Sequence, residues 1–228
     1  DNVARALGAN LFFTRLAGHG LPGERLAGPT VQDWMDDVAE ALAIGQRIGR
    51  NVIVIATSTG GTLAAEAAIH PDLKDKVAGV VFVSPNFGLE SAAAKILTWP
   101  AVRWWGPVVA GRERCFEALN DDHARFWTTC YPTEALFPMG ALVRHAAGAD
   151  YSSVTVPALF VYSPDDKVVS SMATEDIMTR WAAPLDAMAV VVGEGDDPWS
   201  HVIAGDILSP GKTAEVGDRI VSWVRGLP

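Results

Sequence analysis

Residues 51–61 limit the folds open to this chain more than any other segment. The apolar, β-branched run at 52–55 leads into Ala-Thr-Ser-Thr-Gly-Gly, and an alanine-rich stretch with helical spacing follows. A short unbroken apolar run of this kind predicts a buried strand, and the stretch after it predicts a helix. The sequence therefore predicts a sharp strand-to-helix turn with Ser58 at its corner.

Ser58 has two possible roles at this corner. Ala56 and Gly60 are small enough to let the chain turn tightly, which would push the serine hydroxyl beyond the sheet as a nucleophile. The Thr59 amide would then lie at the helix start, where unpaired N–H groups and the helix dipole favour a developing oxyanion. In the alternative interpretation, the serine and its threonine neighbours only cap a helix.

Composition excludes several classes of protein. The chain has 228 residues, 49% of them hydrophobic, which is enough for one full-sized core. Its net charge of −9, without a basic stripe, argues against nucleic-acid binding. No apolar run approaches the roughly 18 residues of a membrane span. Cys115 and Cys130 fit no zinc motif, so no metal is expected; they form either one disulfide or two free buried thiols.

Strand and helix patterns alternate along most of the chain. Apolar strands that are buried on both sides, separated by helices, predict a parallel sheet covered by helices on both faces. The expected strands are residues 10–14, 51–56, 77–84, 158–163 and 187–192, and the expected helices are residues 31–48, 59–70, 170–181 and 213–225.

Residues 86–154 break this alternation, because they contain no convincing core strand. We predict a helical cap or lid here, inserted into a core built from residues 1–85 and 155–228. The insertion is rich in large aromatic residues, which either pack it onto the core or shape a binding site. These residues are Phe87, Trp99, Trp104, Trp105, Phe116, Phe126, Trp127 and Phe137.

A serine nucleophile needs a base, and the base needs an acid that orients it. Asp165 and Asp166 follow the expected strand at 158–163, and His201 follows the strand at 187–192. The carboxyl ends of parallel strands lie at one edge of a sheet, where active sites form. Asp166 is favoured as the acid because it directly precedes Lys-Val-Val, and Asp165 is expected to cap that turn.

Four other histidines compete for the role of base. His70 lies at a helix end, where histidine is common. His123 and His145 fall in the insertion, and His19 follows the first expected strand. Only His201 follows the right strand, although a solvated loop histidine is the alternative interpretation.

Four segments, LAGHGLPGERLAGPTVQDWMDDV, ATSTGG, FVYSPDDKVV and SHVI, resemble the α/β-hydrolase superfamily, near the bacterial carboxylesterases and monoglyceride lipases. The resemblance spans nearly the whole chain apart from the insertion. It implies the α/β-hydrolase fold, with Ser58 as nucleophile, Asp166 as acid, His201 as base and no cofactor. Ala56 and Ser200 stand where the family usually has glycine.

The family also has two His-Gly segments, and Gly18-His19-Gly20 resembles the later one. This implies that residues 1–8 end the first helix, that about three N-terminal strands are absent, and that the second oxyanion donor lies in the absent part. In the rival interpretation, His19-Gly20-Leu21 is the oxyanion loop and Leu21 is the donor. The family often carries an export or anchor segment, so localisation stays open between cytoplasmic and exported or membrane-anchored.

The resemblance implies hydrolysis of small carboxylic esters through an acyl-enzyme, with a hydrophobic acyl or alcohol group suggested by the aromatic insertion. An amidase, thioesterase or peptidase on the same fold is an alternative, because the fold hosts all of these. A non-catalytic binding protein with a vestigial triad is a third interpretation. Nothing in the sequence sets the oligomeric state.

Overall fold

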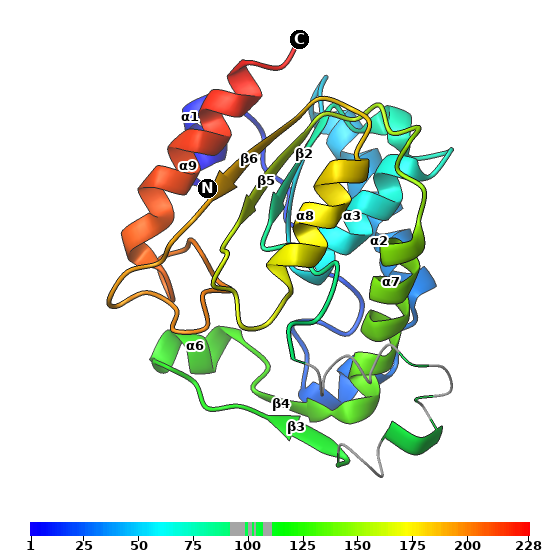
Figure 1. The fold of residues 1–228 in the computed structure, drawn as a ribbon, viewed down its shortest axis with the longest axis vertical. Coiled ribbons are helices and arrows are strands. Elements are labelled where there is room, and N and C mark those ends of the chain that lie inside the picture. The colour runs from blue at the N-terminus through cyan, green and yellow to red at the C-terminus, as the bar shows by residue number, and fades with distance from the viewer. Residues whose placement is uncertain (92–98, 100–101, 103, 107–110) are drawn as a thin grey trace.

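The computed structural model describes residues 1–91, 99, 102, 104–106 and 111–228 (Figure 1). Its centre is a parallel sheet with the strand order β1-β2-β5-β6. The strands are β1 (Ile53–Thr57), β2 (Gly79–Val83), β5 (Ala158–Tyr162) and β6 (Leu185–Ala189). The parallel sheet predicted from the alternating pattern is therefore confirmed.

Helices cover both faces of this sheet (Figure 1). One face carries α9 (Pro210–Arg225) and the short α1 (Asn2–Leu7), which are joined by a hydrogen bond from the Arg225 guanidinium to the Ala6 carbonyl. The other face carries α2 (Val31–Ile48), α3 (Thr59–Ile69), α7 (Leu136–Gly148) and α8 (Ser171–Arg180). None of the described helices is long and apolar enough to cross a membrane.

The central strand β2 shows why two helical layers are needed. Successive side chains of a strand point to opposite faces, and Val80, Val81 and Phe82 are all completely buried. Val80 and Phe82 belong to the core under α3 and α8, whereas Val81 packs in the core with Val216 and Ile220 of α9. A strand that is apolar on both sides can be buried only between two layers.

Residues 10–14 do not form the predicted strand. None of them takes part in a strand among the described residues, and Phe13 is 75% exposed. A strand needs a neighbouring backbone to pair with, and within the described part of the chain β1 pairs with β2 alone. Asn10 instead donates a side-chain hydrogen bond to the Ile48 carbonyl at the end of α2.

Two predicted boundaries also shift. The strand predicted at residues 187–192 begins earlier, at Leu185, because Leu185 and Asp186 pair with the start of β5. Asp186 is exposed on this edge strand and forms an ion pair with Arg219 of α9, which explains why an apolar pattern missed it. Helix α9 begins at Pro210, since proline is favoured in the first helical turn, where its missing N–H has no acceptor.

The insertion contains a small antiparallel hairpin of β3 (Glu113–Cys115) and β4 (Cys130–Pro132), with α6 (Asp121–Phe126) between the two strands. A disulfide joins Cys115 to Cys130 across the pair. Both cysteines are exposed, so the alternative of two free buried thiols is wrong. The hairpin and α6 lie beyond the carboxyl ends of the sheet strands (Figure 1).

Helix α7 falls in the predicted insertion but packs as part of the core. Its Ala146 is fully buried in the core of the main sheet, and Leu142 packs against Leu63 of α3 and Trp34 of α2. The assignment of residues 86–154 to a cap stays a prediction, and this packing favours a cap that ends before α7. Parts of the predicted cap, residues 92–98, 100–101, 103 and 107–110, lie outside the described residues.

Candidate active site

Ser58 occupies the predicted corner between β1 and α3. Its φ of 52° lies in the left-handed region, which is strained for a serine. Its amide donates to the Val83 carbonyl at 3.1 Å, and its carbonyl accepts from the amides of Gly61 at 2.9 Å and Asn86 at 3.0 Å. The Ser58 side chain makes no capping bond to α3. Ser58 thus occupies the N-cap position of α3, but the side-chain bond that a capping role would provide is not formed.

The small residue that the turn needs is Gly61 rather than Gly60. A Cβ on Gly61 would lie 2.8 Å from the Pro85 Cβ, whereas a Cβ on Gly60 would meet nothing within 4 Å. Ala56 is buried at the end of β1 and is small enough for its site. The prediction that Gly60 permits the turn is wrong in this respect, because the close approach is to a loop that follows a different strand.

The structure brings Ser58, His201 and Asp166 into one chain of hydrogen bonds. His201 Nε2 lies 3.1 Å from Ser58 Oγ, and His201 Nδ1 lies 2.8 Å from Asp166 Oδ2. The Asp166 side chain is only 2% exposed, and that of His201 is 15% exposed. Both distances fall within the normal range of hydrogen bonds, so the side chains singled out in the sequence meet at the carboxyl edge of the sheet.

Asp166 also closes the turn in which it lies. Its Oδ1 accepts from the amides of Val168 at 2.8 Å and Val169 at 2.9 Å, while Oδ2 faces His201. The prediction that Asp165 caps this turn is wrong. The Asp165 side chain is exposed, and no hydrogen bond reaches its carboxylate within the described part of the chain. One buried carboxylate performs both tasks with two different oxygens.

The Thr59 N–H is an unused donor beside Ser58. Thr59 is the first residue of α3, so no carbonyl of its own helix can accept from it. No other acceptor for this amide occurs among the residues that the structure describes. The helix dipole adds partial positive charge at this position, which suits an oxyanion.

Leu21 lies in a cavity that contains none of Ser58, Asp166 and His201. It lines this cavity of about 490 Å³ together with residues 20, 22 and 23 and residues 125–130 of the insertion. His19 packs edge-on against Trp34 of α2. The role of Leu21 as a second oxyanion donor stays a prediction.

The model of the alpha/beta hydrolase family matches residues 1–215 of the chain. The chain belongs to this family. Together with the parallel sheet and its two helical layers, this match confirms the fold predicted from the sequence. Membership in this family supports a hydrolase but does not identify the bond that it cleaves.

Solved structures share the fold of this hydrolase at low sequence identity. One from the description of LipS and LipT, two metagenome-derived lipolytic enzymes, has a TM-score of 0.73 at 18% identity over 98% of this chain and 86% of that one. For the monoglyceride lipase of Saccharomyces cerevisiae, the TM-score is 0.65 and the identity 13%, over 92% of this chain and 75% of that one. For E-2-(acetamidomethylene)succinate hydrolase, the TM-score is 0.59 and the identity 21%, over 99% of this chain and 87% of that one. No curated protein sequence matches significantly.

One buried carboxylate beside His201 was missed in the sequence pattern. Asp197 is only 3% exposed and accepts a hydrogen bond from the His201 backbone amide at 3.0 Å. The available signal is an acid four residues before the histidine, in Asp-Asp-Pro-Trp-Ser-His. No cluster of three or more side chains that could ligate a metal ion occurs among the described residues.

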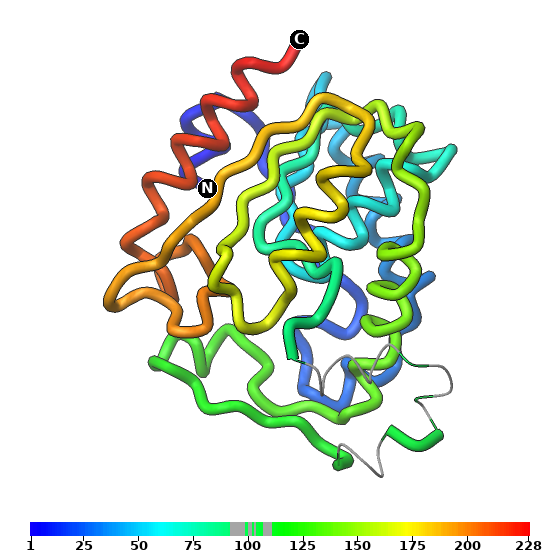
Figure 2. Tube along the Cα trace, in the orientation of Figure 1, coloured from blue at the N-terminus to red at the C-terminus, as the bar shows by residue number. Residues whose placement is uncertain are grey.

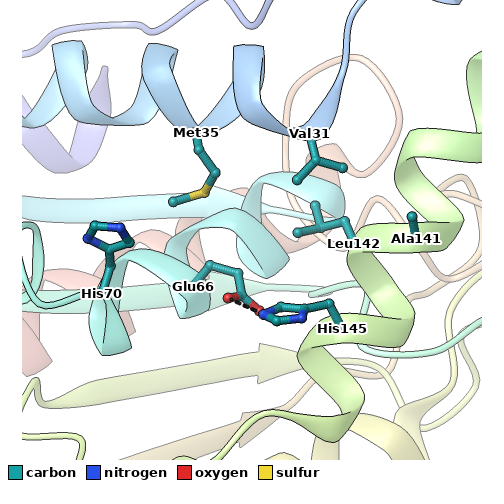
Figure 3. Close-up of a pocket in the computed structure, with 7 residues that line it drawn as sticks. All are labelled: Val31, Met35, Glu66, His70, Ala141, Leu142 and His145. Atoms are coloured by element: carbon teal, nitrogen blue, oxygen red, sulfur yellow. Dashed lines mark ion pairs between the residues drawn. The ribbon is translucent and has the colours of Figure 1, made fainter.

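A second cavity of about 360 Å³ lies between α2, α3 and α7 and contains none of these site residues (Figure 3). Its carboxylate, Glu66, pairs with His145 at 3.3 Å, and the other oxygen of Glu66 is buried without a partner in the described structure. Burial raises the pKa of Glu66, and the nearby His145 and His70 oppose this effect. The lining residues are Val31, Met35, Glu66, His70, Ala141, Leu142 and His145.

We predict that Glu66→Gln stabilises the protein more at pH 8 than at pH 5. Where folding raises the pKa of a carboxyl group, its ionisation destabilises the folded protein. The free energy of unfolding therefore falls as the pH rises from the pKa of the group in the unfolded chain through its pKa in the folded protein. The Gln variant escapes this loss because it carries no ionisable group at this buried position. Urea unfolding at both pH values measures the difference, with the exposed Glu40→Gln of α2 as the control. A gain that is larger at pH 5 would contradict the prediction.

Proposed function

We propose that this protein is a serine hydrolase that cleaves carboxylic esters through an acyl-enzyme. The observation that carries the proposal is the hydrogen-bonded order Ser58 Oγ, His201 Nε2, His201 Nδ1 and Asp166 Oδ2, with contacts of 3.1 and 2.8 Å. This arrangement has the geometry that a serine nucleophile, its base and its orienting acid require.

The contacts support one role for each group. Asp166 Oδ2 accepts a hydrogen bond from the Nδ1–H of His201, so Nε2 carries a lone pair that faces the Ser58 hydroxyl. As Ser58 attacks the ester carbonyl, His201 takes its proton, and the Asp166 carboxylate stabilises the imidazolium that forms. The Thr59 N–H donates to the carbonyl oxygen as negative charge develops on it. His201 then protonates the departing alcohol, and water releases the acyl group by the reverse sequence of proton transfers.

The insertion supports an ester with an apolar acyl or alcohol group. Among its aromatic side chains, Phe87 is buried in the core of the main sheet, and Phe137 is buried with Leu89 and Val102 inside the insertion. Trp99, Trp104 and Phe126 are 60%, 80% and 62% exposed, so they offer apolar surface to a ligand. Two of the fold neighbours described above are named as lipolytic enzymes or lipases, which agrees with this substrate class.

Ser58→Ala is expected to lower the hydrolysis of p-nitrophenyl esters by roughly 10⁴-fold or more and to abolish labelling by a fluorophosphonate probe. Ser84→Ala is the matched control. Ser84 also follows a sheet strand with a positive φ, of 43°, but its hydroxyl is buried without a partner in the described structure. Labelling of the Ser58→Ala protein, or loss of labelling only in Ser84→Ala, would refute the assignment of the nucleophile.

Asp166→Asn is expected to lower kcat by roughly 10⁴-fold with little change in KM, because the amide favours the wrong tautomer of His201. The neighbouring Asp165→Asn changes the same charge on an exposed side chain away from His201 and should keep kcat within about two-fold. Steady-state kinetics on a panel of esters, thioesters, amides and peptides gives both constants. Faster turnover of an amide or thioester than of any ester would replace the proposed substrate class.

A further inference from the structure

Asp197 lies in the loop between β6 and α9, and its carboxylate accepts hydrogen bonds from three backbone amides. Oδ1 accepts from the Trp199 amide at 3.1 Å, and Oδ2 accepts from the amides of His201 at 3.0 Å and Val202 at 2.8 Å. The residue is 3% exposed. A buried carboxylate is tolerated where backbone donors replace its water, and these donors all come from the turn that carries His201.

Ser209 closes the same loop from its other end. This fully buried serine precedes α9, and its hydroxyl accepts from the Asp197 amide at 3.1 Å and donates to the Val202 carbonyl. We call Asp197 and Ser209 the His201 clamp. The clamp bonds to the backbone on both sides of His201 and ties it to the start of a long helix.

The clamp encloses a strained residue. Ser200, directly before His201, has a φ of 54° in the left-handed region that serine disfavours, and its amide donates to the Asp197 carbonyl at 2.9 Å. A strained conformation persists only where the surrounding contacts over-determine it. The hydrogen bonds from the amides of Trp199, His201 and Val202 to the Asp197 carboxylate lie on both sides of Ser200 and hold it in this conformation.

The clamped loop is also joined to the loop of Asp166. The Lys167 amide donates to the Trp199 carbonyl at 2.9 Å, and the Lys167 ammonium donates to the Pro198 carbonyl at 2.7 Å. The backbone that carries the imidazole is therefore held by Asp197 from inside its own loop and by Lys167 from the neighbouring one.

We infer that Asp197 is a positioning residue: it holds the backbone of His201 so that the imidazole reaches Ser58 and Asp166 together. The effect on turnover rests on the proposed function, whereas the effect on the His201 ring does not. The carboxylate is required because its two oxygens accept from three converging donors. An asparagine has an NH₂ group in place of one of these oxygens. That group would face the backbone N–H groups as a second donor, so the hydrogen bonds to that oxygen would be lost.

The preceding residue provides a matched control. Asp196 is half-buried in the same loop, and its carboxylate accepts from the amides of Gly193 and Gly211, each at 3.0 Å. Its carboxylate ties the loop to Gly211 of α9, and no hydrogen bond joins it to the turn of His201 in the described structure. Substitution of either aspartate removes one charge and backbone bonds from this loop, and only one of the two substitutions touches the support of the imidazole.

The test compares Asp197→Asn, Asp196→Asn and Ser209→Ala with the unchanged protein. Asp197→Asn should lower kcat and the rate of fluorophosphonate labelling by about 10²-fold, because a displacement near 1 Å at a reacting group has an effect of this size. KM should stay within about three-fold. Ser209→Ala should lower kcat less, and Asp196→Asn should keep kcat within about two-fold even where urea unfolding shows it to be destabilised.

A readout that is independent of activity separates this inference from the proposed function. The Nδ1 proton shared by His201 and Asp166 should give a far-downfield proton NMR signal, assigned by its loss in His201→Gln. We expect the signal in the unchanged protein and in Asp196→Asn, and its loss or broadening in Asp197→Asn. A protein that shows this pattern without labelling or ester turnover would refute the proposed function and keep the inference.

Two results would overturn the inference. One is a folded Asp197→Asn protein with unchanged kcat and an unchanged downfield signal. The other is an equal loss of kcat in Asp196→Asn, which would show a general effect of the loop. If Asp197→Asn does not fold, Ser209→Ala decides the question, because it keeps the buried carboxylate and removes one link of the clamp. Unchanged kcat and signal in the folded Ser209→Ala would then overturn the inference.

Discussion

The His201 imidazole contacts two partners at once, and the geometry of the candidate site depends on this double contact. Ser58 Oγ and Asp166 Oδ2 lie 3.1 and 2.8 Å from its two nitrogens, and the three residues follow β1, β5 and β6. A slip of one residue in the pairing of these strands moves a side chain by about 3.3 Å, which is enough to break either bond. The buried core that fixes the register of the sheet is therefore also a condition for the site.

Backbone strain is concentrated at the same edge of the sheet. The non-glycine residues with positive φ among the described residues are Ser58, Ser84 and Ser200. The amide of each is anchored, by Val83, Val161 and Asp197 respectively. The sheet supplies the first two anchors through backbone carbonyls of the next strand. Ser200 lies in a long loop without that support, so a buried side chain of the loop itself has to stabilise the turn.

The fold could be predicted because periodicity is local, and the residues of the candidate site could be predicted because each stands out by residue type after a strand. Ser58 directly follows β1, Asp166 lies four residues after β5, and His201 lies in the long loop that follows β6. Interactions between distant segments were beyond this reasoning. Residues 10–14 have the apolar pattern of a strand without a partner to pair with, which no local pattern reveals. Asp197 looks like an ordinary loop acid until the amides that surround it are known.

The insertion and the loop of His201 are physically joined. Asn120 accepts from the His123 amide at 2.8 Å, which caps α6, and its side-chain amide donates to the Ile207 carbonyl at 2.9 Å, two residues before Ser209. Figure 2 shows the green trace of α6 beside the orange loop that leads to α9. On its other side, the hairpin approaches Gly23 so closely that a Cβ there would collide with the Cys130 carbonyl. The insertion is therefore held on one side by the loop that carries His201, close to the start of α9, and on the other side by the segment around Gly23.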